Sequence, residues 1–284
     1  MRFYTCGNDR MIDFLRITLA AARRALPNAE FRIIPFDDNL ELTRGLAARV
    51  GATIVEPDPY WDELGMFLFK DTDYRPGVPA YRYFRKFNAF NGDPDSFVFC
   101  DANMAILADL SPLFEAFEKG SSSIVFSRYA VPRQFKPHVL PKIQLLNPHM
   151  RDGYSCSGFI ARGNALPRRD VDVFFRNPLW GKWLGQAPEQ GFISLYSAIY
   201  GIAWETYGEL LGYGPEDTVG ASRKRERGAD GFYYFSKGDL AGKLSYFCKW
   251  THQSLKPDAP NIEIHDELAA RARRFYNGLN KAQA

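Results

Sequence analysis

The first 55 residues alternate between short apolar runs and longer segments with a helical apolar period. In the first longer segment, apolar residues recur every three or four positions, which predicts an amphipathic helix. They are Met11, Leu15, Leu19, Ala22 and Leu26. Apolar runs predict strands at 2–6, 31–36 and 53–55, and a second helix is predicted at 40–50. This alternation of strands and helices is typical of a parallel sheet with crossover helices.

The rest of the chain is less regular but keeps the same alternation. We interpret the polar, turn-rich stretch 57–79 as a surface excursion, and an aromatic helix is predicted at 81–90. The unbroken apolar run 96–100 is typical of a central strand buried on both faces. Further strands are predicted at 123–126, 156–161, 204–207 and 232–235, and further helices at 171–176 and 188–200 and beginning at 111 and 266. The pattern predicts a single α/β domain with a mostly parallel central sheet flanked by helices.

Composition and charge exclude several classes of protein. Hydrophobic residues make up 46% of the 284 residues, which excludes intrinsic disorder. The net charge of +3 gives no reason to expect a nucleic-acid partner. No apolar run approaches the roughly 18 residues that a transmembrane helix needs, and the N-terminus lacks the pattern of a secretory signal. The four cysteines form no CxxC pair, so we expect reduced thiols in a cytoplasmic protein and no zinc site. The basic run 223–227 is typical of a solvated loop.

Acidic and amide side chains follow three of the predicted strands. They are Asn8-Asp9, Asp37-Asp38 and Asp101-Ala102-Asn103. In an open parallel sheet, ligands bind at the carboxyl ends of the strands. Asp101 and Asn103 could aim two oxygens at one divalent cation, which could bridge the phosphates of a nucleotide diphosphate. An Asp at a strand end also serves as a turn former, so this pattern alone leaves both interpretations open.

Residues 95–115, DSFVFCDANMAILADLSPLFE, carry a more specific pattern. The segment resembles the metal-binding segment of GT-A nucleotide-sugar glycosyltransferases, especially the glycogenin and bacterial lipopolysaccharide galactosyltransferase family (family 8). Asp101 matches the first acid of the DxD motif and Asn103 the second. Further resemblances follow in the family's order over about 1–257. Arg85-Lys86-Phe87 matches a basic block, Tyr154 to Phe159 a strand with an Asn-Ser-Gly core, and Glu189-Gln190-Gly191 an Asp-Gln-Gly motif.

The resemblance implies a Rossmann-like GT-A domain at 1–257, with a nucleotide-binding half at 1–110 and a sugar and acceptor half at 111–257. Residues 258–284 would form a C-terminal helical extension. The implied activity is transfer of a sugar from a nucleotide-diphosphate sugar to a hydroxyl acceptor, with retention of the anomeric configuration. The alternative is a catalytically inactive nucleotide-sugar-binding protein of the same fold.

The acceptor, whether a saccharide, a lipid-linked glycan or a protein, is not specified by these motifs. Bacterial relatives build surface polysaccharides, which implies a cytoplasmic location at the inner face of the membrane. The basic C-terminal helix would then be a candidate for a peripheral membrane contact.

The resemblance also assigns roles to individual residues. The catalytic residues would be Asp101, Glu189 and Gln190. The nucleotide sugar would contact Thr5, Cys6, Gly7, Asp37, Lys86, Ala102, Ser157, Gly158 and Lys249. A Mn²⁺ or Mg²⁺ ion would be held by Asp101, Asn103 and His252.

Two departures from the family's pattern affect the metal. Asn103 brings an oxygen but no charge, so a dication would be held more weakly than by two acids. The family's late His belongs to a segment resembling HxxGxxKP, and counting back from Lys256-Pro257 places it near Lys249 or Trp250, not at His252. Either His252 acts from a shifted register, or the ammonium of Lys249 replaces the cation and neutralises the departing diphosphate. We expect a retained but weakened metal site.

Overall fold

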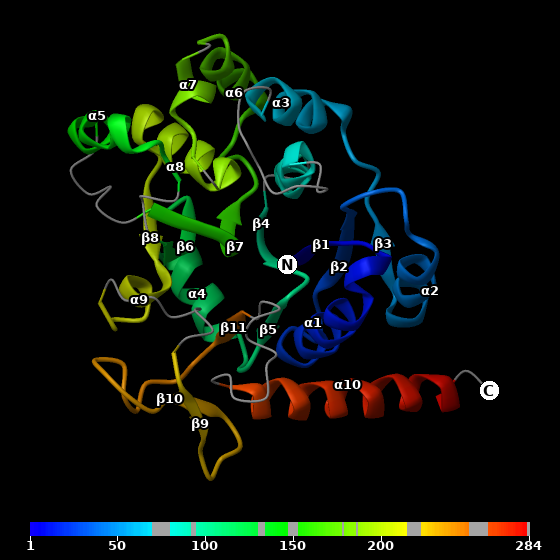
Figure 1. The fold of residues 1–284 in the computed structure, drawn as a ribbon. Helices are drawn as coiled ribbons and strands as arrows, with labels where there is room; N and C mark the ends of the chain where they lie inside the picture. The colour runs from blue at the N-terminus through cyan, green and yellow to red at the C-terminus, as the bar shows by residue number, and fades with distance from the viewer. Residues whose placement is uncertain are drawn as a thin grey trace.

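A seven-stranded, mostly parallel sheet runs through the centre of the computed structural model, in the order β3-β2-β1-β4-β7-β6-β8 (Figure 1). The structure describes residues 1–69, 80–91, 95–129, 134–146, 153–177, 179–185, 187–214, 223–249 and 261–282. The strands are β1 (Arg2–Gly7), β2 (Glu30–Pro35), β3 (Ala52–Ile54), β4 (Ser96–Asp101), β6 (Ile124–Tyr129), β7 (Gly153–Arg162) and β8 (Trp204–Thr206). β7 is antiparallel to both of its neighbours, and the other pairs are parallel. The predicted α/β architecture is confirmed.

The predicted crossover helices α1 (Ile12–Ala25) and α2 (Glu41–Val50) are present and cover one face of the sheet. The N-terminus of α2 is held by Asp9, whose carboxylate accepts hydrogen bonds from the backbone N–H groups of Leu42 at 3.0 Å and Thr43 at 2.8 Å. These two groups have no partner inside the helix. Asp9 therefore has a structural role, which explains its position after β1.

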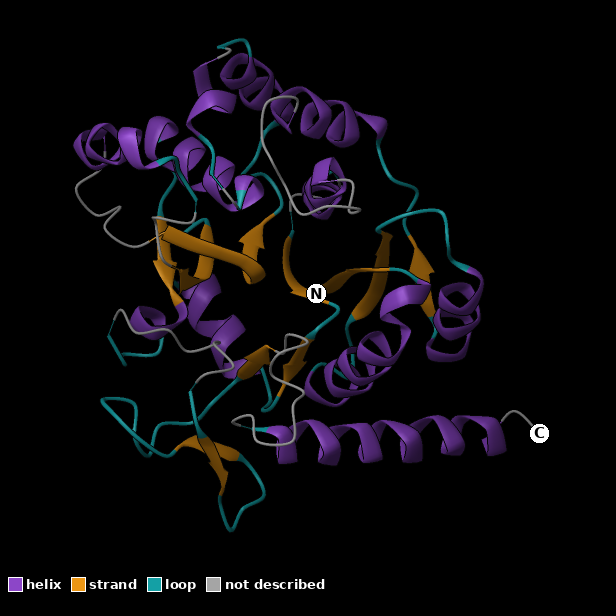
Figure 2. Ribbon diagram, viewed as in Figure 1, coloured by secondary structure: helices purple, strands orange, loops and turns teal. Residues whose placement is uncertain are grey.

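A second set of helices lies over the opposite face (Figure 2). Beneath them is a core rich in aromatic side chains. These helices are α3 (Pro59–Phe69), the 3₁₀ helix η2 (Ala80–Phe90), α5 (Leu140–Leu146), α6 (Arg168–Phe175), α7 (Leu179–Trp183) and α8 (Pro188–Tyr200). The surface excursion predicted at 57–79 is wrong for its first half, because α3 buries Trp61, Leu64 and Leu68. Their spacing of three and four residues is helical, and proline is tolerated in the first turn of a helix.

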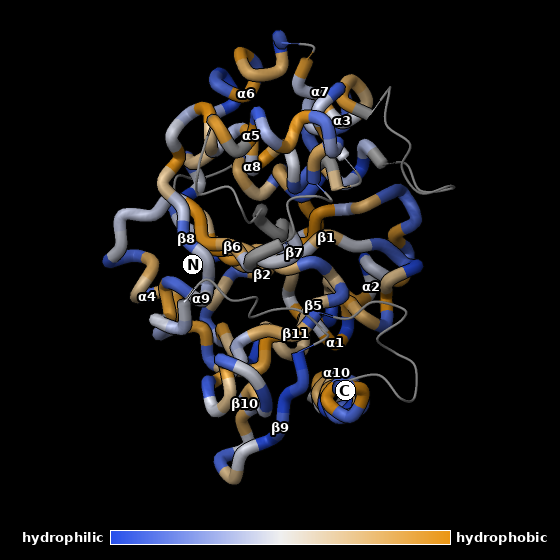
Figure 3. The backbone as a smooth tube through the Cα atoms, turned by 60° about the vertical axis from the view of Figure 1, so that its left-hand side comes forward, coloured by the Kyte–Doolittle hydropathy of each residue, from blue (hydrophilic) through white to orange (hydrophobic). Residues whose placement is uncertain are grey.

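Beyond the central sheet, two small antiparallel pairs extend the structure. β5 (Met104–Ile106) pairs with β11 (Phe247–Lys249), and β9 (Arg225–Arg227) pairs with β10 (Tyr233–Phe235). Helices α4 (Ser111–Lys119) and α9 (Tyr207–Leu210) contact each other, and the 3₁₀ turns η1 (Asp9–Met11) and η4 (Pro137–Val139) lead directly into α1 and α5. The solvated loop predicted at 223–227 is wrong at Arg225, which is buried although β9 lies in a hydrophilic stretch (Figure 3). Its guanidinium donates to Ser245 Oγ at 2.7 Å and to the carbonyl of Phe247 at 3.1 Å.

The C-terminal helix α10 (Ile262–Ala282) lies alongside α1 (Figure 1). Its apolar side chains Ile264, Leu268, Ala272 and Tyr276 belong to the same core as α1, so this face is covered by the protein itself. Among the described residues, no helix is long and apolar enough to cross a membrane.

Candidate functional site

The site forms where β4 ends at Asp101 and the chain turns through Ala102 and Asn103 into β5. This turn is held by Thr18 of α1, whose hydroxyl oxygen lies 2.6 Å from the carbonyl oxygen of Ala102 and 2.5 Å from that of Met104. β1 pairs with β2 on one side and β4 on the other, so the β1/β4 boundary is the point where the strand order reverses. Ligands bind at such switch points in open α/β sheets.

Lys86 reaches this point from η2, on the aromatic face of the sheet. Its Nζ atom lies 3.3 Å from Asp101 Oδ1 and 3.8 Å from Glu189 Oε1. The side chain of Lys86 is only 5% exposed, and that of Glu189 only 4%. A buried ammonium is tolerated only when anions compensate its charge, and the two carboxylates do so here.

Lys249 approaches from the other side of Asp101, on β11. The antiparallel pairing of β11 with β5 sets Lys249 opposite Met104, next to the turn. Its Nζ atom lies 3.3 Å from Asp101 Oδ2 and donates a hydrogen bond to Ser157 Oγ on β7. Each oxygen of the Asp101 carboxylate therefore contacts a different ammonium group. We refer to Lys86, Asp101 and Lys249 as the lysine–aspartate cluster.

Glu189 and Gln190 lie side by side in the first turn of α8 and are both buried. Gln190 Nε2 lies 3.5 Å from Glu189 Oε1, within reach of a hydrogen bond. The amide oxygen Oε1 of Gln190 is buried and has no hydrogen-bond partner among the described residues. A buried acceptor without a partner is costly, so this oxygen is suited to a donor that arrives with a ligand, such as a hydroxyl group.

Among the residues expected to contact the nucleotide sugar, Thr5, Cys6 and Gly7 lie at the end of β1, and Asp37 follows β2. Strand alternation places the buried Thr5 side chain on the α1 face, and that of Cys6 on the opposite face with Asp101, its partner in β4. Burial raises the pKa of the Cys6 thiol to about 12, although the positive charge of Lys86 opposes the shift. Asp37 accepts a hydrogen bond from Asn8 Nδ2 at 2.7 Å and lies 3.7 Å from Arg82.

Three further candidate residues, Gly158, Gly7 and Asn103, lie close to the turn that follows β4. The space beside Gly158 is filled by the Met104 side chain, since a Cβ atom on Gly158 would lie 2.6 Å from Met104 Cε. Gly7 is buried, and a Cβ atom there would make ordinary contacts with Leu15 and Ala102. Asn103 is half-buried in the turn after Asp101.

No protein-family profile matches this sequence, and no curated protein does so either. Solved structures do share its fold. Mouse xyloside xylosyltransferase 1 is 10% identical over 90% of this chain and 99% of its own, with a TM-score of 0.57. The galactosyltransferase LgtC, in complex with donor and acceptor sugar analogs, is 11% identical over 95% of each chain, with a TM-score of 0.60. The chain has the GT-A glycosyltransferase fold. The fold implied by the sequence resemblance is thereby confirmed.

A more remote neighbour contains a metal ion. Core-mannan synthase A from Aspergillus fumigatus, in a Mn/GDP form, is 11% identical over 72% of each chain, with a TM-score of 0.48.

The described donor atoms around the cluster do not by themselves form a site for a divalent cation. In the part of the chain that the structure describes, no group of three His, Cys, Asp or Glu residues is placed to hold one. His252, the third predicted ligand, lies outside the described residues. Both oxygens of Asp101 already lie 3.3 Å from ammonium groups. A dication about 4 Å from one ammonium would be repelled by roughly 8 kcal/mol at an effective dielectric constant of about 20, and its attraction to Asp101, which two ammonium groups already share, would have to exceed this repulsion.

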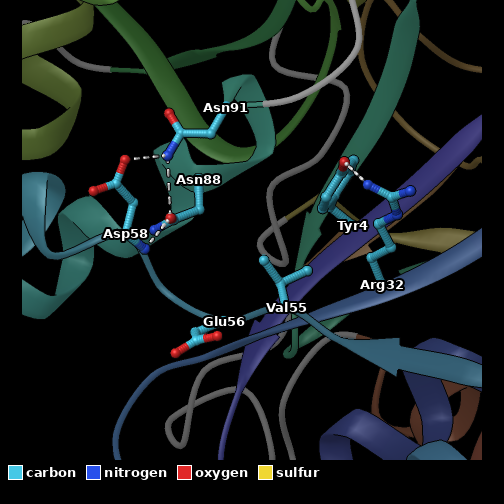
Figure 4. Close-up of a pocket in the computed structure, with 7 residues that line it drawn as sticks. All are labelled: Tyr4, Arg32, Val55, Glu56, Asp58, Asn88 and Asn91. Carbon is cyan, nitrogen blue, oxygen red and sulfur yellow. Dashed lines mark hydrogen bonds between the residues drawn. The ribbon is translucent and has the colours of Figure 1, made fainter.

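A separate pocket of about 280 Å³ opens on the aromatic side of β1 and β2 (Figure 4). Its lining residues are Tyr4, Arg32, Val55, Glu56, Asp58, Asn88 and Asn91. Several of their polar groups bond to one another, as Asn91 Nδ2 does to Asp58 Oδ2 at 3.0 Å and Arg32 Nη1 to Tyr4 OH at 3.0 Å. None of the residues of the lysine–aspartate cluster lines this pocket.

Sequence reasoning missed Thr18 and the acidic partners of the basic residues in η2. Thr18 lies one position before Leu19 on the buried stripe of α1, and a polar residue on such a stripe is the signal that it bonds to something. The three basic residues of η2 each lie beside a different acid. Arg82 lies beside Asp37, Arg85 binds Asp62 at 2.6 Å, and Lys86 binds Asp101.

Proposed function

We propose that this chain is a glycosyltransferase that moves a sugar from a nucleotide-diphosphate sugar to a hydroxyl acceptor. In this reaction the bond between the anomeric carbon and the β-phosphate oxygen breaks, and its electron pair stays on the diphosphate. A new bond forms between the anomeric carbon and the acceptor oxygen. The acceptor's proton passes to the departing diphosphate and then to solvent.

The observation that carries this proposal is the lysine–aspartate cluster at the switch point of a GT-A sheet. Two ammonium groups at the end of β4 can counter the charge that develops on a leaving diphosphate. Cys6, which pairs with Asp101 in β4, and the following residue Gly7 would present backbone to the nucleotide. Across the cluster, Glu189 lies 3.8 Å from Lys86, and its neighbour Gln190 offers a buried acceptor to a sugar hydroxyl.

We further propose retention of the anomeric configuration, with the departing diphosphate guiding the acceptor on the same face of the sugar. Inversion would need a carboxylate base on the opposite face. Glu189 is the natural candidate for that base, but it already contacts Lys86. The configuration of the product's new glycosidic bond, read from the proton NMR coupling at the anomeric position, separates the two outcomes.

The direct test is to incubate the purified protein with UDP-, GDP-, ADP- and dTDP-sugars and to measure release of the nucleoside diphosphate. We expect release from at least one donor, stimulated by an acceptor, and strongly reduced in Asp101→Ala. The control variant Lys119→Met changes an exposed lysine on α4 and should behave as the wild type. Tight donor binding with no turnover for any donor would contradict catalysis and favour the inactive, nucleotide-sugar-binding alternative.

A further inference from the structure

We propose that the ammonium group of Lys249 takes the place of a divalent cation, so that the donor diphosphate is bound and released without a metal ion. This inference rests on the proposed function, because it concerns the diphosphate of the same donor. It is carried by the contacts of Lys249, by the charge of the site and by the donor atoms around Asp101.

The contacts of Lys249 hold its ammonium in place and leave it room for a ligand. An ammonium has three N–H donors. Two of the contacts are with Asp101 Oδ2 at 3.3 Å and with Ser157 Oγ. No further polar partner of Lys249 is present in the described part of the chain, and 28% of its side chain is exposed. One donor is therefore available to a phosphate oxygen.

Lys249 and Asn103, the two departures from the DxD-and-His pattern, compensate each other in charge. Two carboxylates and one dication sum to zero charge. Asp101, neutral Asn103 and the ammonium of Lys249 also sum to zero, and the charges of Lys86 and Glu189 cancel each other. The two departures from the DxD-and-His pattern therefore compensate each other, whereas either one alone would change the charge presented to the diphosphate. A dication added beside Lys249 would instead leave the site with an excess of two positive charges.

In the transfer step, Lys249 acts through charge and hydrogen bonding. When the bond from the anomeric carbon to the β-phosphate oxygen breaks, the electron pair stays on that oxygen and the diphosphate gains one negative charge. A charge-assisted hydrogen bond from the ammonium strengthens as this charge grows. Lys249 keeps its protons throughout, and the acceptor's proton leaves with the diphosphate. Asp101 and Ser157 are positioning residues for this ammonium.

The test measures binding of UDP, GDP, ADP and dTDP by isothermal titration calorimetry, once in EDTA and once in MnCl₂. The proteins are the wild type, Lys249→Met, Lys249→Arg and the control Lys119→Met. For at least one diphosphate, we expect wild-type affinity to differ by less than about twofold between the buffers. Lys249→Met should weaken binding roughly 10- to 100-fold in EDTA, since it removes a hydrogen bond from a charged group. Lys249→Arg should recover most of the affinity, and Lys119→Met should bind as the wild type.

Each result decides between the two proposals. If the wild type binds a diphosphate only in manganese, or if Lys249→Met binds as well as the wild type, Lys249 does not replace a cation, while the proposed function stands. If no diphosphate binds in either buffer, the proposed function fails and this inference fails with it. The comparison of buffers uses the wild type alone, so it holds even if a Lys249 variant does not fold.

Discussion

The ion pair between Lys86 and Glu189 gives a quantitative test of how the site is built. Both side chains are almost completely buried, at 5% and 4% exposure, and the charged atoms are 3.8 Å apart. At an effective dielectric constant of about 20, unit charges at this separation attract by roughly 4 kcal/mol. Removing one partner of a buried pair costs about 3–5 kcal/mol, because the other charge stays buried with less compensation. We therefore expect Lys86→Met to lower the free energy of unfolding by about 3–5 kcal/mol.

A double-mutant cycle with Glu189→Gln isolates the pair from the other contacts of each residue. The double variant should be more stable than the sum of the single effects predicts, with a coupling of about 1–3 kcal/mol. The assay is urea unfolding followed by tryptophan fluorescence and far-UV circular dichroism. Coincidence of the two transitions checks that unfolding is two-state.

The chain contains a matched control at nearly the same distance. Lys119 and Glu115 on α4 are 3.7 Å apart, but their side chains are 80% and 69% exposed. Their cycle, with Lys119→Met and Glu115→Gln, should give a coupling below about 0.5 kcal/mol. Equal couplings in the two cycles would refute the reasoning, because burial would then not strengthen the pair at the site.

Three other residues give independent predictions. Asp9→Ala should lower the free energy of unfolding by about 1 kcal/mol at neutral pH, because the carboxylate holds the start of α2. The pKa of Asp9 is lowered in the folded protein: burial acts to raise it, but hydrogen bonds from Thr43 and Leu42 lower it by more. Its contribution is therefore present above the unfolded pKa of about 3.9 and is lost as the pH falls through the folded value, so urea titrations should show the two proteins converging in acid. Thr18→Val should lower the free energy of unfolding in urea by about 1 kcal/mol. It should also lower the rate of diphosphate release per folded molecule, because the turn that carries Asp101 loses its hydrogen bond to Thr18. An unchanged rate would contradict this positioning role. The pKa of the half-buried Cys6 thiol is raised to about 12, so its alkylation by iodoacetamide at pH 8, followed by peptide mass spectrometry, should be far slower than that of the unfolded chain, and equal rates would be inconsistent with a thiol that stays protonated at pH 8.

The sequence was sufficient to predict the sheet because the strands are short apolar runs with clear turn residues between them. The helices α1 and α2 followed from apolar spacing alone. Helix α3 was missed because Pro57, Pro59 and Gly65 dominate the local pattern, although Trp61 and Leu64 already show a helical period. Gly65 packs so closely against Tyr81 that a Cβ atom would lie 2.5 Å from the carbonyl oxygen of Tyr81. This tertiary contact explains why a glycine stands inside α3, and it cannot be read from the local sequence.

The candidate site was likewise only partly predictable from the sequence. Asp101 could be identified because it ends a buried strand, and the resemblance supplied Lys86, Glu189 and Gln190. The partnership of Lys249 with Asp101 depends on the pairing of β11 with β5, between residues far apart in the chain. Three consecutive residues, Phe247 to Lys249, form that strand, too few to give a periodic signal. Similarly, Arg225 lies in a charged run, and only its contacts with Ser245 and Phe247 explain why it is buried.

The most direct test of the account is a crystal structure of the protein with a bound nucleoside diphosphate, grown in EDTA. The account predicts a β-phosphate oxygen within hydrogen-bond distance of Lys249 Nζ, beside Asp101, with the nucleoside against Cys6 and Gly7 at the end of β1. A diphosphate bound elsewhere on the protein would contradict the site. A diphosphate that binds only after manganese is added, with the ion on Asp101 and Asn103, would keep the site but contradict the role of Lys249.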